Sequence, residues 1–349
     1  MSSAGLDGTD LAAALPGIDT EPAAARNGKR HLRGAAMSGI AVVTPDNIVT
    51  NAPIAERLGV DDRWIVKRTG IKQRPVATDE TVAELSAKAA AKTLEATGLD
   101  PADVDLVLVA TMTPDLITPN VAPMVVNHLD MGATAACDVG AACTGWLHGV
   151  NLASAAVEGG RADNVLVIGA DFMSRVTDHD DRSTAALWAD GVGSVLVSTI
   201  PGASRIGPVV LGTDPAGAFL IHATHEEGVI RMKGQETFGA AVSHLSNAAM
   251  QALAAAGLGL DDIDVFAFHQ ANARIIKTVG ERLELPTERV INCVDRYGNS
   301  SAATLPIALG EAHAQGRLAP GTRVLLSTFG AGFTWGAAVV KWGLPSPLS

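Results

Sequence analysis

The sequence predicts a duplicated α/β fold built from two similar halves. The first observation is an internal repeat, because residues 94–109 (LEATGLDPADVDLVLV) align without a gap on residues 253–268 (LAAAGLGLDDIDVFAF). Each copy has the pattern of a helix end, a glycine stop, an acidic turn and a buried strand. The second observation is an Ala-rich amphipathic helix before each copy, at 83–94 and at 240–253. The shared order predicts two related units of helix and sheet.

Two further apolar segments predict strands that are covered on both faces. They are NVLVIGADF at 164–172 and VLLSTFG at 324–330, one in each half. Ligands of open α/β sheets collect where strands end and helices begin, so we expect a site at these strand ends.

The repeat also sets the expected boundaries. We place an N-terminal half at 35–205 and a C-terminal half at 206–349, after a loose extension at 1–34. The extension is rich in Ala, Gly and Asp and lacks a basic head followed by an apolar stretch. It therefore does not resemble a secretory signal.

The composition excludes several classes of protein. With 47% hydrophobic and 18% charged residues the chain is expected to be globular, and a formal net charge of -11 argues against a nucleic-acid surface. No apolar run approaches the ~18 residues that a membrane helix requires. Three cysteines without a CxxC pair predict neither a disulfide framework nor a zinc site, which favours a cytoplasmic setting.

Cys143 is the first candidate for chemistry. It opens the segment CTGWLHGVNLASAAVEGG, which predicts a helix ending at Gly159 with an apolar face of Trp146, Leu147, Val150, Leu152, Ala153 and Ala156. The thiol would lie at a helix N-terminus, whose field lowers a cysteine pKa of ~8.5 by only about 1.5 units. A nucleophile would need a neighbouring base or proton acceptor as well, and a buried structural cysteine remains the alternative.

Two polar residues of the second half lie at similar junctions. His269 follows the repeat strand in FHQANARII, and Asn299 lies between a glycine and a helix start in RYGNSSAATLPIAL. Taken alone, His269 fits a hydrogen-bonded strand-end residue and Asn299 fits a helix N-cap. A cysteine, a histidine and an asparagine at such junctions of a duplicated sheet together favour a catalytic site.

The segment STFGAGFTWG at 327–336 supplies a fourth feature. Gly330, Ala331 and Gly332 permit a tight turn with exposed backbone N–H groups, which suit developing negative charge on a thioester oxygen. A simple glycine turn between two terminal strands fits the same residues.

Other clusters receive a structural interpretation. DHDD at 178–181 and HATHEEG at 222–228 lack the pattern of metal sites, and the glycines of WADGVGS at 188–194 are too few for a dinucleotide site. We expect His148 to be a packing residue, and Cys137 and Cys293 to be buried spacers. No metal site is predicted.

In combination, the motifs resemble one family. CDVGAACTGW, FHQANARI, YGNSSAATLPIAL and STFGAGFTWG, in this order, are similar to those of the β-ketoacyl-acyl-carrier-protein synthase III family of the thiolase superfamily. RWIVKRTGIKQR at 63–74 and WADGVGS also match, and the likeness extends over residues 35–343. The resemblance implies a thiolase-like five-layered α/β/α/β/α fold of two duplicated halves, and a homodimer.

The resemblance also assigns roles to individual residues. Cys143 would be the nucleophile, His269 and Asn299 would complete the triad, and the backbone N–H groups of Cys143 and Ala331 would form the oxyanion hole. The substrate contacts that it implies are Trp64, Arg68 and Arg182 for the nucleotide end of coenzyme A, Asn272 for its pantetheine side, Arg274 for carrier-protein docking and Thr118 for the acyl pocket across the dimer.

The implied reaction joins an acyl-CoA primer to a malonyl group on an acyl carrier protein. Cys143 would accept the acyl group, and His269 and Asn299 would donate hydrogen bonds to the enolate left when the malonyl group loses CO2. STFGAGFTWG contains no cysteine, so the second thiol of thiolases is missing and condensation is favoured over thiolysis. The product would be a 3-oxoacyl thioester for fatty acid or polyketide biosynthesis, made without a cofactor.

Two other functions remain open at this point. One is an acyltransferase that passes the acyl group to an alcohol or amine without decarboxylation, although the presence of Asn299 argues against it. The other is a non-catalytic partner subunit, against which Cys143 and His269 also argue.

The sequence does not fix the primer. The loop at 213–232 is shorter than is usual for the family, and Gly239 stands where a basic carrier contact is common. Thr118 is small where some members have an aromatic residue, which favours room for more than an acetyl group.

Overall fold

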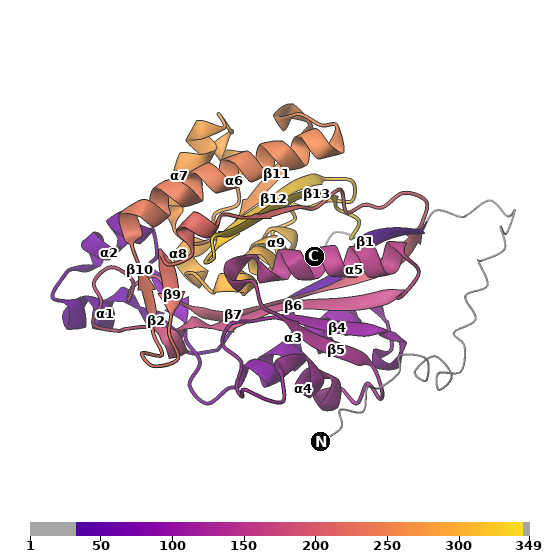
Figure 1. Ribbon diagram of the computed structural model, residues 1–349, viewed down its shortest axis with the longest axis horizontal. Helices are drawn as coiled ribbons and strands as arrows, with labels where there is room; N and C mark the ends of the chain where they lie inside the picture. Colours follow the sequence, from indigo (N-terminus) through magenta and orange to yellow (C-terminus); the bar gives the residue numbers. More distant parts are fainter. Residues whose placement is uncertain (1–32, 345–349) are drawn as a thin grey trace, which may run out of the picture. The chain divides into compact units, whose positions relative to one another are not determined.

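Five alternating layers of helices and sheets make up residues 33–344, the part of the chain that the computed structural model describes. In Figure 1, α3 and α4 lie below a first sheet, α5 and α9 lie between the sheets, and α6 and α7 lie above the second. This is the predicted α/β/α/β/α order. Of the extension predicted at 1–34, residues 1–32 lie outside the described residues, and the first strand begins at Arg33.

The first sheet has five strands in the order β1-β7-β6-β4-β5. β4 pairs in parallel with β5 and β6, whereas β7 is antiparallel to both β6 and β1. The strands are β1 (Arg33–Val43), β4 (Leu106–Ala110), β5 (Ala135–Val139), β6 (Asn164–Phe172) and β7 (Asp190–Pro201). β4, β6 and β7 are mostly buried, as expected for strands covered on both faces.

The second sheet has four strands in the order β11-β12-β13-β8. β11 pairs in parallel with β12, and β13 is antiparallel to β12 and β8. The strands are β8 (Val210–Thr213), β11 (Val265–Phe268), β12 (Arg323–Gly330) and β13 (Thr334–Lys341). Residues 202–209 connect β7 to β8 and so join the two sheets.

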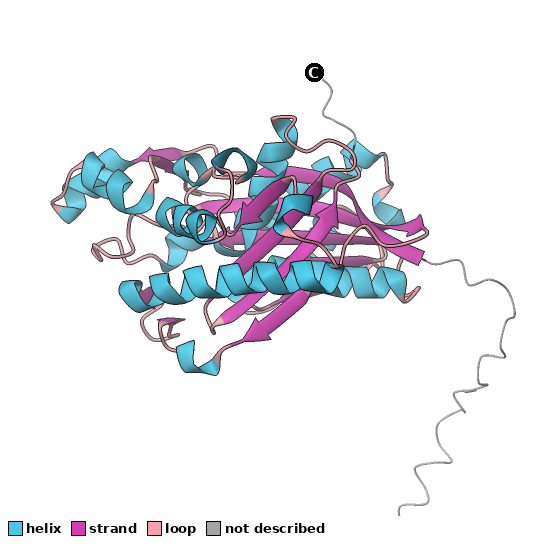
Figure 2. Cartoon of the chain, turned by 90° about the horizontal axis from the view of Figure 1, so that it is seen from above, coloured by secondary structure: helices cyan, strands magenta, loops and turns pink. Residues whose placement is uncertain are grey.

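Helices cover the outer faces of both sheets and fill the layer between them. Figure 2, which looks from the side of α6, shows helices lying across the strands. The outer helices are α3 (Val82–Thr97), α4 (Val121–His128), α6 (Gly234–Ala256) and α7 (Ala273–Arg282), and the inner ones are α5 (Gly145–Glu158) and α9 (Thr304–Ala314). The inner pair packs in a core of mainly Ala, Val and Leu side chains contributed by both sheets.

Smaller elements lie around this framework. They are α1 (Asn51–Leu58), α2 (Asp62–Thr69), α8 (Val294–Tyr297), the paired strands β2 (Ile48–Thr50) and β3 (Gln73–Pro75), and the paired strands β9 (Ile221–Ala223) and β10 (Ile230–Met232). Short 3-10 turns, η2 (Ala142–Thr144) and η7 (Ser301–Ala303), lead into α5 and α9. Within residues 33–344, no helix combines the length and apolar character needed to cross a membrane.

The two copies of the internal repeat have the same local structure, including the same backbone hydrogen bonds. α3 and α6 both end at a glycine in the left-handed region, Gly98 with φ 68° and Gly257 with φ 67°. In each copy the following leucine N–H group bonds back to a leucine carbonyl five residues earlier, at 3.2 Å in the first and 3.0 Å in the second. A 3-10 turn and then β4 or β11 follow. The same sequence signals therefore fold in the same way twice.

Two glycines allow the first sheet to touch the second half directly. A Cβ atom on Gly169 of β6 would lie 2.5 Å from the carbonyl oxygen of Ala302, and one on Gly193 of β7 would lie 2.6 Å from Pro306. Gly169 and Gly193 are also partners in the sheet register. A side chain at either position would push η7 and α9 away, so this contact requires glycine.

Two burial predictions are wrong. Cys137 is exposed because β5 is the edge strand of the first sheet. Leu152, expected on the buried face of its helix, is 48% exposed. The buried face of α5 instead follows Val150, Ala153 and Val157, whose spacing of three and four residues leaves Leu152 to one side. Cys293 is buried, as predicted.

Gly169→Ala should destabilise the protein by about 1–3 kcal/mol, because extra atoms in a packed interior cost that much. Gly239→Ala is the matched control, since Gly239 lies in α6 and no atom comes within 4 Å of the place its Cβ would take. There alanine should raise stability by up to about 1 kcal/mol. Urea unfolding measures both, and a Gly169→Ala variant as stable as wild type would contradict the close contact.

Candidate active site

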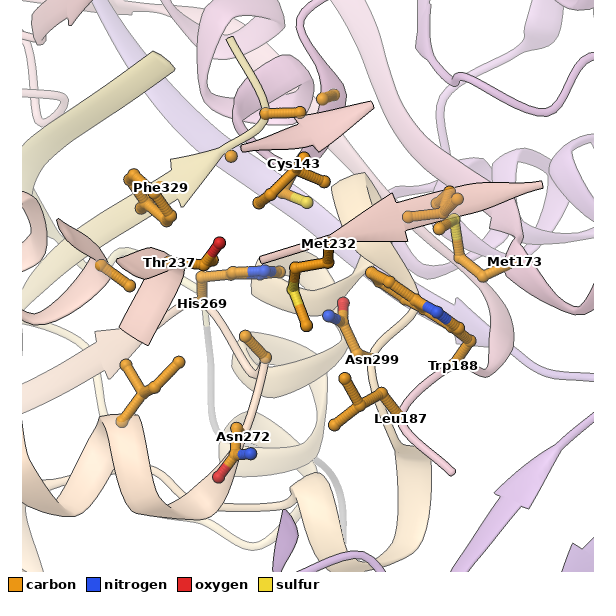
Figure 3. A pocket seen from close by; sticks show the side chains of 18 of the residues that line it. Cys143, Met173, Leu187, Trp188, Met232, Thr237, His269, Asn272, Asn299 and Phe329 are labelled. Carbon is orange, nitrogen blue, oxygen red and sulfur yellow. The ribbon is translucent and has the colours of Figure 1, made fainter. Parts of the chain in front are cut away.

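One pocket brings together the three side chains that the sequence singled out. Cys143, His269 and Asn299 all line it, and Figure 3 shows them pointing toward a common space. Cys143 comes from the first half, whereas the other two come from the second. The remaining wall is largely apolar and includes Met112, Met173, Leu187, Trp188, Met232 and Phe329.

Cys143 lies in the turn η2, directly before α5. The residue before it, Ala142, has φ 45°, a left-handed conformation that is uncommon for residues with a Cβ and indicates local strain. The second half holds this turn in place. Thr328 Oγ1 donates to the Cys143 carbonyl at 3.1 Å, and a Cβ on Gly330 would lie 2.9 Å from the Cys143 nitrogen.

Burial decides the charge of the Cys143 thiol. Burial raises the pKa of Cys143 to about 11; the Ser301 hydroxyl lowers it, the charge of Asp171 raises it, and the N–H groups of Cys143 and Ala331 lower it. The helix field considered from the sequence is outweighed, so the thiol is neutral at pH 7. Because both N–H groups act on the sulfur, two main-chain donors lie beside it, at the predicted oxyanion hole.

His269 follows β11 and is 3% exposed. Its backbone N–H group donates to the Ser327 carbonyl at 2.9 Å, and its Nδ1 lies 2.5 Å from Thr304 Oγ1. Burial lowers the pKa of His269 to about 3, so the imidazole is neutral at pH 7. With Nδ1 bonded to Thr304, Nε2 is the nitrogen left for the pocket.

Asn299 lies just before η7 and is fixed through its backbone and its side chain. Its N–H group donates to the Leu187 carbonyl at 2.9 Å, and its own carbonyl accepts from the Ala189 N–H group at 3.0 Å. Its Oδ1 accepts from the Ser301 N–H group at 3.0 Å. Since that bond uses the oxygen, the Nδ2 amide remains as the donor. The bond to Ser301, which matches the capping role considered from the sequence, therefore also orients the Nδ2 donor.

A groove that adjoins the pocket contains the residues expected to bind coenzyme A and the carrier. Trp64, Arg68, Arg182, Asn272 and Arg274 all line it. The groove and the pocket share five wall residues, so one leads into the other: Leu187, Met232, Gly234, Phe238 and Asn272.

Stacking and capping hold the groove together. The Arg68 guanidinium lies 3.9 Å from the centre of the Trp64 ring, and that of Arg182 lies 5.8 Å from it. The Asn272 side chain accepts from the Arg274 N–H group at 2.8 Å and donates to the Arg68 carbonyl at 3.0 Å, which ties α7 to α2. Two guanidinium groups beside an indole suit an anionic aromatic ligand such as a nucleotide.

Thr118 does not line the pocket of its own chain. It is exposed in the loop between β4 and α4, next to Ile117, which is 98% exposed. The resemblance placed Thr118 in a pocket across a dimer, a role that a single chain does not test.

The acidic side chains of the DHDD segment form salt bridges, and His148 contacts the backbone of its own helix region. Asp178 pairs with Arg231 at 2.5 Å, and Asp180 pairs with Arg57 at 2.7 Å. His148 Nδ1 lies 3.0 Å from the Thr144 carbonyl, one turn earlier. In the part of the chain that the structure describes, no group of three or more His, Cys, Asp and Glu side chains is arranged to hold a metal ion.

Thr304 is a site residue that the sequence analysis did not identify. It is buried at the start of α9, and its hydroxyl is the Nδ1 partner of His269. The motif YGNSSAATLPIAL shows a threonine near a helix start, but nothing in the sequence places that helix against the end of β11.

Known proteins match this chain in sequence. The family profile of 3-oxoacyl-[acyl-carrier-protein] synthase III matches residues 137–215, and the profile of its C-terminal part matches residues 253–342. A β-ketoacyl-[acyl-carrier-protein] synthase III from Streptomyces coelicolor is 40% identical over 330 residues, covering 93% of this chain and 98% of the relative. One from Rhizorhabdus wittichii is 40% identical over 319 residues, covering 89% and 100%.

Solved structures agree with this result. The β-ketoacyl-[acyl-carrier-protein] synthase III of Thermus thermophilus superposes with a TM-score of 0.85 at 40% identity, covering 88% of this chain and 99% of that one. A priming β-ketosynthase from a polyketide pathway gives 0.86 at 32% identity, covering 91% and 98%. The fold and its relatives define a condensing enzyme with the thiolase fold. The chain belongs to the 3-oxoacyl-[acyl-carrier-protein] synthase III family.

Alkylation of Cys143 should be slow at pH 7 and should accelerate with pH. A pKa of about 11 leaves about one thiol in 10⁴ ionised at pH 7, so the rate should rise about tenfold per pH unit up to pH ~10. Iodoacetamide labelling resolved by peptide mass spectrometry measures this rate. The exposed Cys137 and the buried Cys293 are internal references for labelled and protected thiols. A Cys143 rate that is already constant above pH 8 would contradict a neutral resting thiol.

Proposed function

We propose that this chain is an acyltransferase that condenses an acyl-CoA primer with a malonyl thioester, releasing CO2 and a 3-oxoacyl thioester. The observation that carries the proposal is one thiol and two neutral hydrogen-bonding side chains around a single, largely apolar pocket. Membership of the family supports the same reaction, and the polyketide relative supports a priming role.

In the first half-reaction, Cys143 Sγ attacks the carbonyl carbon of the acyl-CoA thioester. The new carbon–sulfur bond replaces the one to coenzyme A, and the thiol proton ends on the departing sulfur. The N–H groups of Cys143 and Ala331 stabilise the negative charge on the carbonyl oxygen. Exchange of one thioester for another changes little free energy, so the step needs positioning more than driving force.

In the second half-reaction, a malonyl thioester loses its carboxylate as CO2. The electron pair of the broken carbon–carbon bond forms an enolate, whose oxygen accepts hydrogen bonds from His269 Nε2–H and Asn299 Nδ2–H. The enolate carbon then attacks the acyl carbon on Cys143 and displaces the sulfur. Neutral donors suit this step, because an imidazolium would also attract the carboxylate that must leave.

Thr304 sets the tautomer that this step requires. If the Thr304 hydroxyl donates to His269 Nδ1, the ring proton lies on Nε2, where it faces the enolate. Thr304 is therefore proposed as the residue that keeps His269 a donor.

We also propose the partners that the sequence implied. Acyl-CoA would enter by the groove of Trp64, Arg68 and Arg182, with Asn272 at its pantetheine, and an acyl carrier protein would dock at Arg274. A second copy of the chain would cover the exposed loop with Ile117 and receive Thr118 in its acyl pocket. The reaction needs no metal or organic cofactor, and its substrates favour a cytoplasmic setting.

Transfer of the acyl group to an alcohol or amine is not favoured. That reaction forms no enolate, so it gives no role to an amide donor held as rigidly as Asn299. A non-catalytic subunit is not favoured either, because it would not need the thiol in this pocket.

Two variants should separate the half-reactions. Cys143→Ala should abolish acyl transfer from acyl-CoA to the protein, because no other thiol lies in the pocket. Asn299→Ala should retain acylation but lose CO2 release from malonyl carrier by about 10²–10³-fold, the effect of removing one oxyanion donor. Mass analysis of the Cys143 peptide, with a panel of acyl-CoAs, and trapping of labelled CO2 measure the two steps. Normal acylation of wild type without any decarboxylation would favour the alcohol or amine acyltransferase.

Thr304→Val should lower CO2 release about tenfold or more, because without the Thr304 hydroxyl nothing holds the ring proton on Nε2, and the alternative tautomer with its proton on Nδ1 presents a lone pair to the enolate. Thr304→Ser, which keeps the hydroxyl, is the matched control and should stay close to wild type. The same assay of malonyl decarboxylation compares them. Equal rates for the valine and serine variants would remove Thr304 from the mechanism.

A further inference from the structure

Asp171 is a fully buried carboxylate at the end of β6, beside the pocket but not in its wall. Its Oδ1 accepts three hydrogen bonds from the segment after β4, from the Met112 N–H group at 2.8 Å and from the Thr111 and Thr113 hydroxyls at 3.1 Å. Its Oδ2 accepts from the Ala302 N–H group at 3.0 Å. Burial raises the pKa of Asp171, whereas the hydrogen bonds from the Met112 and Ala302 N–H groups lower it.

The Asp171 carboxylate therefore joins two segments that carry the site. One segment contributes Met112 to the pocket wall, and the other is η7, which begins two residues after Asn299. The bond to Ala302 links Asp171 to the turn that orients Asn299, because the neighbouring Ser301 N–H group is the one that holds Asn299 Oδ1. Ser301 has φ 51°, so this turn is strained and needs support from its surroundings.

The backbone of β6 already presses against the same turn. Gly169, two residues before Asp171, leaves no room for a Cβ beside the Ala302 carbonyl. Steric contact fixes the distance between β6 and η7, but only a directional bond fixes the rotation of the turn. The bond from the Ala302 N–H group to the Asp171 carboxylate supplies that direction.

We infer that Asp171 is a positioning residue for the decarboxylation step: by accepting the Ala302 N–H group it holds η7 in the rotation that aims the Asn299 amide at the enolate oxygen. This role rests on the proposed function. The positioning role concerns the second half-reaction, because the Asn299 amide has no proposed part in the first. The charge of Asp171 acts on Cys143 separately, by raising the pKa of its thiol. Asp171 thus acts through Asn299 and does not contact the reacting atoms.

Asp171→Asn tests the inference without changing the size of the side chain. The amide oxygen should stay where three donors converge, so the NH2 group would face the Ala302 N–H group and lose the bond. We expect malonyl decarboxylation to fall about 10–100-fold, as for a misplaced catalytic group. Acylation of Cys143 should not fall, because loss of the Asp171 charge removes one cause that raises the pKa of the Cys143 thiol. An equal loss in both steps would overturn the inference.

Asp190→Asn is the matched control. Asp190 is also fully buried and lies opposite Phe172 in the neighbouring strand β7, but it accepts hydrogen bonds from Ala77 and Ser174 instead of from η7. Its loss should weaken the fold to a similar degree without changing the ratio of decarboxylation to acylation. If the ratio of decarboxylation to acylation fell as far in Asp190→Asn as in Asp171→Asn, the loss would reflect a general loss of stability, and the inference would be overturned.

A double-variant cycle identifies the route. If Asp171 acts through Asn299, adding Asp171→Asn to Asn299→Ala should change the residual decarboxylation by less than about twofold. Effects that multiply would overturn the inference. A crystal structure of Asp171→Asn gives a readout independent of activity, since residues 299–303 should be displaced and an unmoved Asn299 amide would refute the role. Wild type that never decarboxylates malonyl thioesters would instead refute the proposed function.

Discussion

The chemistry of this chain depends on the burial of its reactive side chains where the two halves meet. Burial raises the pKa of Cys143 to about 11 and lowers that of His269 to about 3, so both groups are uncharged at pH 7. The resting state is therefore not the thiolate–imidazolium ion pair that many cysteine hydrolases use. The site instead presents neutral donors in a largely apolar pocket, where an enolate gains more from a hydrogen bond than it would in water.

Duplication supplies the geometry for such a site. The first half contributes the Cys143 turn at the end of its edge strand, and the second contributes His269, the η7 region and the glycine turn after β12. Close backbone contacts at Gly169 and Gly330 set the distance between the halves, and the Asp171 carboxylate spans the same junction by hydrogen bonds. Thus the contacts that stabilise the interface are also those that align the catalytic groups.

Much of this could be predicted from the sequence, because the signals were local. The helix, glycine stop, acidic turn and strand of each repeat follow from hydrogen bonds within a few residues, and the motifs around Cys143, His269 and Asn299 mark strand ends. The features that the sequence did not predict depend on long-range contacts. Cys137 is exposed because β5 lies at a sheet edge. The roles of Thr304 and Asp171 depend on partners more than thirty residues away in the chain. The charge of Cys143 also required the pocket, since burial outweighs the helix field.

The neutral, donating state of His269 is the central claim, and nitrogen NMR tests it most directly. In protein labelled with ¹⁵N at histidine, the His269 signals, assigned by their absence in His269→Gln, should show a neutral ring with the proton on Nε2 from pH 8 down to pH 5. A His269 ring that titrates near pH 6.5, or that carries its proton on Nδ1, would contradict the account.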